Sequence, residues 1–208
     1  IKDKDLNPIY DRDQSHVIVH GNYTSFKQGP MKVTKSPLDV AIEGQGLIEV
    51  STPQGVKYTR HGSFKVSADG RLVTNEGYPV LLARAGGLMS DTPDASKENS
   101  NTAARFINMK DRGNISITEK GEIYSGTDLL GQMSLVEFQD PKFLQKTGLQ
   151  YFTNTSSEKN PIKDTSTSLL HQGMVEGSNV NPVEEMTNLI KANRLFEHDL
   201  KVMKTFGE

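Results

Sequence analysis

Residues 178–208 carry the pattern that most constrains the fold, because they predict one long amphipathic helix at the end of a chain that otherwise shows strand and turn signals. Asn181 is suited to cap this helix, Pro182 fits the first helical position, and Glu184 follows the cap as in a capping box. Glu184 and Glu185 also lie in the first turn, where the helix dipole favours negative charge. We therefore expect the helix to begin at residue 182.

Apolar residues recur at spacings of three and four along this helix and form one stripe. No second segment shows the same period, so the chain offers no matching helix. The stripe can pack on its own domain, or it can bind a helix from a missing N-terminal segment or another subunit. The heptad spacing of Leu189, Phe196 and Met203 favours the second alternative, as does the polar segment before the helix. The candidate assembly interface, called the stripe below, consists of Val183, Met186, Leu189, Ile190, Phe196, Leu200 and Met203.

The remaining sequence predicts a mainly β fold, with an antiparallel β domain, extended arms and the long C-terminal α-helix. Short apolar runs are separated by the turn-forming residues Gly, Asn and Asp. Hairpin turns are expected at residues 68–70, 75–77 and 119–121. We expect an extended lead-in over 1–36, the β domain over 37–152, a linker with a short strand over 153–177, and the helix over 178–208. Residues 86–105 are rich in small polar side chains and predict a surface loop.

Composition narrows the possible partners. Hydrophobic residues make up 34% of the 208 residues and the mean hydropathy is -0.54, which suits an elongated shape with much surface. The net charge of -2 gives no electrostatic reason to bind nucleic acid or an anionic membrane. No stretch approaches the ~18 apolar residues of a membrane span, so we expect no stable membrane insertion.

The absence of cysteine excludes disulfides and thiolate sites. The chain starts at Ile1 without an initiator Met or a leader, so we expect a trimmed or processed form.

No residue pattern predicts catalysis, a metal site or a cofactor. His16 and His20 are spaced by four residues in a strand-like stretch, whereas a zinc site needs three or four converging ligands. The acidic pairs near the N-terminus, Asp3/Asp5 and Asp11/Asp13, lack the Gly and distal Glu of a calcium loop. The Gly-x-Gly at residues 44–46 indicates a bend between strands and not a phosphate-binding loop. We therefore predict that the protein is not an enzyme and binds no cofactor.

Two long motifs resemble one known family. Residues 37–81, PLDVAIEGQGLIEVSTPQGVKYTRHGSFKVSADGRLVTNEGYPVL, are similar to the signature stretch of bacterial flagellar basal-body rod and hook proteins. Residues 178–202, SNVNPVEEMTNLIKANRLFEHDLKV, resemble the C-terminal signature of that family. Residues 25–29 and the Arg194-x-Phe196-Glu197 motif are most like the proximal-rod branch, with the distal-rod branch next. The N-terminal helix and Asn-rich signature of the family are not present in this chain.

The resemblance implies a structural rod subunit that assembles helically with other rod subunits and transmits torque from motor to hook. It further implies an inner tube of terminal helices with the β domain outside it. It also implies transit through the flagellar export apparatus and assembly in the periplasm. Two alternatives remain open: a distal-rod or hook-type subunit, and a secreted β domain that binds a carbohydrate or protein ligand through residues 86–105. A carboxylate-dependent hydrolase is the least favoured.

Overall fold

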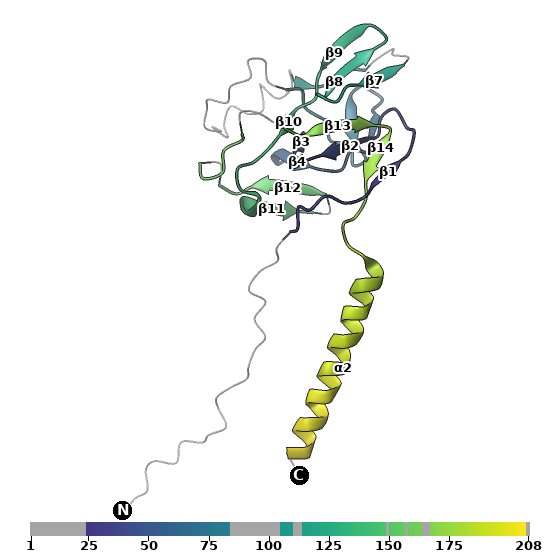
Figure 1. Ribbon diagram of the computed structural model, residues 1–208. Coiled ribbons are helices and arrows are strands. Elements are labelled where there is room, and N and C mark those ends of the chain that lie inside the picture. Colours follow the sequence, from purple (N-terminus) through teal and green to yellow (C-terminus); the bar gives the residue numbers. More distant parts are fainter. Residues whose placement is uncertain are drawn as a thin grey trace, which may run out of the picture.

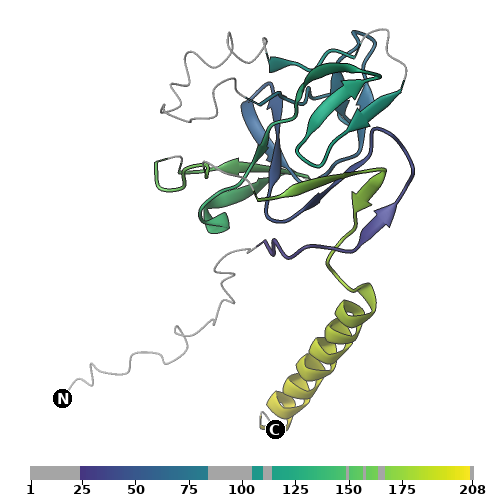
Figure 2. The same cartoon turned by 45° about the horizontal axis from the view of Figure 1, so that its top comes forward.

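The computed structural model describes residues 24–83, 105–109, 114–148, 150–156, 158–163 and 167–206. These residues form a β domain and one long helix, α2 (Pro182–Phe206), which stands clear of the β domain in both views (Figures 1 and 2). All strand pairs are antiparallel. The predicted fold class, mainly antiparallel β with a long C-terminal helix, is therefore confirmed.

The β domain contains one larger sheet and several small ones. The five-stranded sheet has the order β10 (Leu135–Val136), β3 (Leu47–Thr52), β4 (Gly55–Thr59), β12 (Tyr151–Asn154) and β11 (Leu144–Thr147), with the short 3-10 helix η3 (Pro141–Phe143) before β11. A three-stranded sheet joins β7 (Ile115–Ile117), β8 (Glu122–Ser125) and β9 (Asp128–Gln132). The two-stranded sheets are β1 (Met31–Val33) with β14 (Met174–Glu176), β2 (Val40–Glu43) with β13 (Leu169–Gln172), and β5 (Phe64–Val66) with β6 (Leu72–Thr74).

The three predicted turns are present. Gly70 and Gly121 have φ angles of 79° and 83°, a conformation that glycine adopts without a Cβ clash, and they close the β5–β6 and β7–β8 hairpins. The turn at 75–77 is closed by a hydrogen bond from Gly77 N to Thr74 O (2.9 Å). Strand β9 is absent from the sequence prediction. The run GQMSLVEFQ at residues 131–139 predicts one strand, but the structure divides it between the end of β9 and the two residues of β10, with Gly131 at a φ of 147°.

Strand β3 separates two hydrophobic clusters, since successive side chains of a strand point to opposite faces. Ile48 and Val50 belong to the larger cluster with Val40, Leu72 and Leu170. Leu47 belongs to the smaller cluster, which consists of Leu47, Val136, Phe138, Leu144 and Phe152, with Phe26, Tyr58 and Ile162 packed against it. Both faces of β3 are therefore covered by the chain itself.

The buried carboxylate of Glu49 has partners inside the β domain, whereas Asn160 Nδ2 is buried without a hydrogen-bond partner among the described residues. Glu49 is 3% exposed, forms a salt bridge with Arg105, and accepts a hydrogen bond from Ser134 Oγ (2.8 Å). Arg105 Nε also donates to Leu82 O (2.9 Å). Arg105 is the only residue of the predicted 86–105 loop that the structure describes; residues 86–104 lie outside the described residues.

A second polar group links β12 to β6 and to the turn at residues 75–77. Tyr151 Oη donates its proton to Glu76 Oε2 (2.6 Å) and is also hydrogen-bonded to Thr74 Oγ1 (2.9 Å). Burial, followed by the bond to Glu76, raises the pKa of Tyr151. The hydrogen bond from Tyr151 is in turn the main cause that lowers the pKa of Glu76.

The arms on either side of the β domain pair with each other. Met31 faces Glu176, Lys32 faces Val175, and Val33 faces Met174. The end of the predicted lead-in thus forms a ladder with the end of the predicted linker, and residues 1–23 lie outside the described residues. The boundaries assigned to the four sequence segments stay a prediction.

Candidate assembly interface

The helix begins as its sequence predicts. Asn181 Oδ1 accepts a hydrogen bond from Val183 N (3.2 Å), and Asn181 O accepts one from Glu185 N (3.1 Å). Pro182 is the first helical residue, and Glu184 and Glu185 lie in the first turn. The cap and the acidic first turn satisfy and stabilise the helix N-terminus without help from the β domain.

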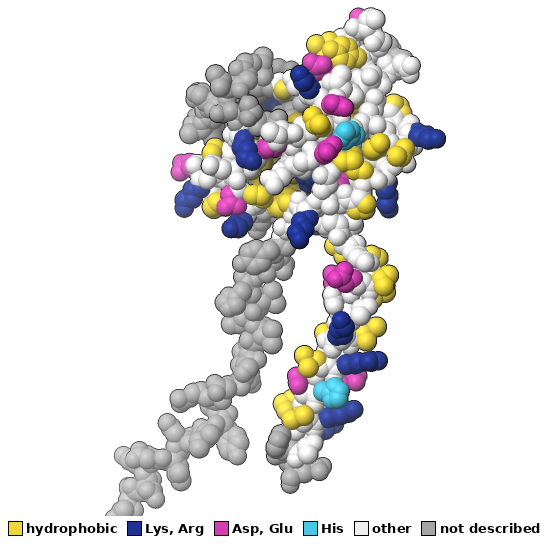
Figure 3. Space-filling view, viewed as in Figure 1, with side chains coloured by type: hydrophobic (Ala, Val, Ile, Leu, Met, Phe, Trp, Pro, Cys, Tyr) yellow, Lys and Arg dark blue, Asp and Glu magenta, His cyan; other side chains and the backbone are white. Residues whose placement is uncertain are grey.

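All seven stripe residues project into solvent. Their side chains are between 40% and 70% exposed, with Leu200 at the lower limit and Val183 at the upper. Figure 3 shows apolar side chains along the helix, clear of the β domain. Every helix residue from 182 to 205 is exposed. In this structure the stripe therefore does not pack on its own domain, and exposed apolar surface of this extent is typical of an interaction site.

Leu195 and Val202 are exposed large apolar residues of the helix that the predicted interface does not include. They are 65% and 52% exposed. At about 100° per residue they lie on roughly the opposite side of the helix from the stripe. Two residues one heptad apart do not form a repeat with spacings of three and four, so the sequence pattern does not include them.

The helix leaves the β domain beside an arginine-centred junction. Arg60 Nη2 and Nε lie 2.9 and 3.0 Å from Glu176 Oε2, at the end of β14. Arg60 Nη1 also donates to Gly44 O (2.9 Å) and Gly46 O (3.1 Å). The Gly-x-Gly segment is thus a bend whose carbonyl oxygens accept from a cation. This geometry is the reverse of a phosphate-binding loop, in which backbone N–H groups face an anion.

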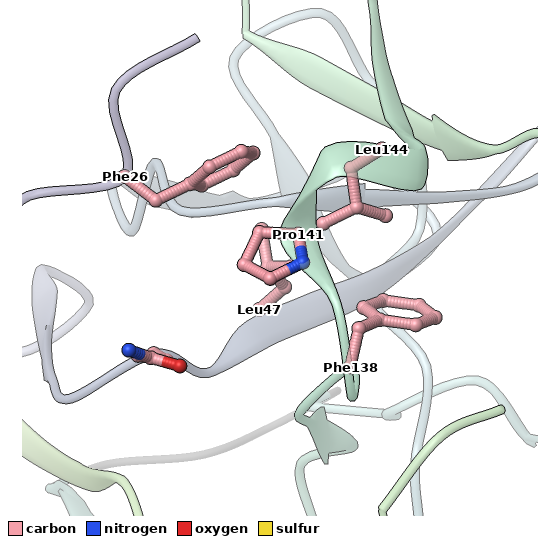
Figure 4. A pocket seen from close by; sticks show the side chains of 6 residues that line it. Phe26, Leu47, Phe138, Pro141 and Leu144 are labelled. Atoms are coloured by element: carbon pink, nitrogen blue, oxygen red, sulfur yellow. The ribbon is translucent and has the colours of Figure 1, made fainter. Parts of the chain in front are cut away.

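Hollows of very different size occur on the β domain. An apolar notch of ≈ 10 Å³ between β3 and η3 is lined by Phe26, Leu47, Phe138, Pro141 and Leu144, together with Gln45 (Figure 4). It has room for about one water molecule. An open groove of ≈ 380 Å³ lies beside the junction, between residues 24–29 and 176–179, and includes Arg60 and His61.

The described part of the chain contains no cluster of metal-ligand residues and no helix that could span a membrane. No group of three or more His, Asp or Glu side chains there is arranged to hold a metal ion. None of the helices within the described ranges is both long and apolar enough to cross a membrane. No metal site is predicted at His16, His20 or the N-terminal aspartates, and these residues lie outside the described ranges.

Comparison with known proteins identifies the family. Residues 41–125 match the family described as "Flagellar hook protein FlgE/F/G D1 domain", and residues 171–208 match "Flagellar basal body rod FlgEFG protein C-terminal". The flagellar basal-body rod protein FlgF of Caulobacter vibrioides is 33% identical over 88% of this chain and 67% of its own length. The chain belongs to the flagellar basal-body rod protein family of FlgF and FlgG.

Rod proteins of both names are similar to this chain. FlgG of Buchnera aphidicola from Acyrthosiphon pisum is 34% identical over 86% of this chain, and FlgG of Bacillus subtilis is 32% identical over 84%. The chain spans 64% of the length of the first and 63% of the second. The predicted family, its structural and non-enzymatic character, and its location in the flagellar basal-body rod are therefore confirmed. The proximal-rod assignment within the family stays a prediction.

The signature residues of this rod protein have structural roles. Gly62 lies against β2, where a Cβ would stand 1.7 Å from Val40 O, so a larger residue cannot occupy the position. Phe64 is buried in the larger cluster. Together with Arg60 at the junction, these residues explain the Arg-x-Gly-x-Phe spacing as one that joins β2, β5 and β14.

Proposed function

We propose that this chain is a structural subunit of the flagellar rod, and that it assembles helically with copies of itself and with neighbouring rod subunits. The stripe is its interface with their helices, and rigid packing passes torque from the motor to the hook. Before assembly the chain passes through the flagellar export apparatus to the periplasm. The observation that supports this role is a helix of 25 residues whose seven stripe side chains are all exposed.

Burial of the stripe supplies an adequate driving force. Covering one such side chain contributes about 1.5–3 kcal/mol, so the seven together contribute roughly 10–20 kcal/mol before the cost of association is subtracted. A contact between the stripe of one subunit and a different surface of the next is heterologous, and heterologous contacts that do not close into a ring produce an open helical polymer.

The test replaces one stripe residue with a charged one. In a flagellated strain that lacks its own copy of the full-length protein, Phe196→Asp should abolish rod assembly and motility, because a carboxylate cannot be buried between apolar helices without a large cost. Lys191→Asp, which also adds an exposed carboxylate but lies off the stripe, is the matched control and should leave cells motile.

Thermal unfolding separates loss of assembly from loss of folding. The purified Phe196→Asp chain should unfold at the same temperature as the unchanged protein, since Phe196 touches no part of the β domain core. If cells with Phe196→Asp build complete flagella, the proposed interface is wrong.

A further inference from the structure

The N-terminal and C-terminal arms run side by side at one edge of the β domain. Beyond the β1–β14 register, Gly177 N donates to Pro30 O (2.9 Å). The arms approach so closely at this point that a Cβ on Gly29 would stand 2.0 Å from Gly177 O. Phe26 fixes the preceding part of the N-terminal arm by packing on Phe152, with ring centroids 5.1 Å apart.

The Glu176 carboxylate ties both arms to the domain. Its Oε2 pairs with Arg60, and its Oε1 accepts a hydrogen bond from Gly29 N (2.9 Å). The side chains of Arg60 and Glu176 are only 13% and 11% exposed. Arg60 reaches the β2–β3 bend as well, so a single guanidinium connects the bend to the C-terminal arm. Two guanidinium nitrogens of Arg60 reach the same oxygen of Glu176, and a shielded arginine pair of this kind holds a fixed geometry better than an exposed lysine pair.

Asn179 extends this connection beyond the end of the strand pairing. Its Nδ2 donates to Lys27 O (2.8 Å) and Ser25 O (3.3 Å) of the N-terminal arm. Val180 and Asn181 alone separate Asn179 from the first helical residue, Pro182. Asn181 is itself the helix cap. The chain between the domain and the helix is therefore held almost up to the first turn.

We propose that Arg60, Glu176 and Asn179 are positioning residues that fix the direction in which α2 leaves the β domain. They lie off the stripe, and they determine where the stripe points relative to the β domain. Without them, residues 177–181 would act as a short flexible linker and the helix would sample many directions. A subunit that transmits force by packing needs one direction, because neighbouring helices and neighbouring β domains must engage together.

The absence of cysteine allows a direct measurement on the full 208-residue chain. Spin labels on Lys146→Cys in β11 and Lys191→Cys in α2 report the distance between domain and helix by pulsed electron paramagnetic resonance, at a dilution where chains are single. The unchanged junction should give one narrow distance distribution. Asn179→Asp keeps the size of the side chain but removes its N–H donors and places a carboxylate beside two carbonyls. It should widen the distribution at least twofold.

Two controls make the result decisive. Asn188→Asp is the same substitution at an exposed helix position, and it should leave the width unchanged. A Gly-Gly-Ser insertion after Val180 shows the width of a released helix. If the Asn179→Asp distribution is as narrow as that of the unchanged junction, or if the unchanged junction is already as broad as the insertion, the proposal is overturned. The measurement uses single chains, so its result does not depend on whether the protein builds a rod.

Discussion

Ile42, Ile48 and Leu72 of the β domain are fully buried by their own chain, whereas Leu189 and Phe196 of α2 are 65% and 63% exposed. The same contrast holds for polar groups, since Glu49 and Glu176 are paired within the domain while Glu184 and Glu185 face solvent. The β domain thus obtains its stability from internal contacts. The helix caps its own N-terminus, but no described residue covers its apolar face. Most of its tertiary stabilisation must therefore come from outside the described residues.

The largest expected effect on stability comes from removing the arginine of the buried salt bridge in the β domain, and it is compared with removing an exposed arginine of α2. Arg105→Ala leaves Glu49 buried without its cation and should lower the free energy of unfolding by about 3–5 kcal/mol. Arg194→Ala, on the exposed helix, should change it by less than about 0.5 kcal/mol. Urea denaturation followed by tyrosine fluorescence measures both. Equal losses would contradict the contrast between the two regions.

A matched pair of leucines sharpens the comparison. Leu72→Ala removes a fully buried side chain and should cost about 2–5 kcal/mol, because a cavity remains in the larger cluster. Leu189→Ala makes the same chemical change on the stripe and should leave the unfolding of the single chain unaltered while weakening assembly. A stability loss at Leu189 comparable to that at Leu72 would show that the chain itself covers the stripe in solution.

The smallest effect concerns the Tyr151–Glu76 hydrogen bond and its pH dependence. Tyr151→Phe should cost about 1–2 kcal/mol at pH 7, since Glu76 loses its donor and Thr74 loses a hydrogen-bond partner. The pKa of Glu76 lies below its usual 4.5 in the folded protein, so its contribution is present above about pH 4.5 and is lost as the pH falls through the folded value. The difference between Tyr151→Phe and the unchanged protein should therefore shrink from pH 7 to pH 3. Denaturation at the two pH values measures it, and a difference that grows on acidification would be inconsistent with this bond.

Local sequence signals predicted the elements that local interactions specify. The Asn181 cap, the period of the stripe and the hairpin turns at Gly70 and Gly121 each involve residues a few positions apart, and the structure contains all of them. Exposure of the stripe agrees with the expectation that no partner segment exists in the printed chain. Its role as an interface stays a proposal.

Contacts between distant segments could not be read from the sequence. Arg60 and Glu176 are 116 positions apart, and Gly29 and Glu176 are 147 apart, so no periodicity links them. Strand β9 was missed for a different reason. Its short DLLGQ sequence contains a glycine and pairs with a register shift next to Tyr124, which removes the regular alternation that marks a strand.

The adjacency of the two arms also bears on how proteins of this architecture diversify. Because Pro30 and Gly177 are hydrogen-bonded neighbours, the chain enters and leaves the β domain at the same place. A domain of another size or shape can be exchanged at those two points without moving the chain on either side. In the proposed rod, the surface chemistry of the β domain could thus change without a change in the helices that form the assembly contacts.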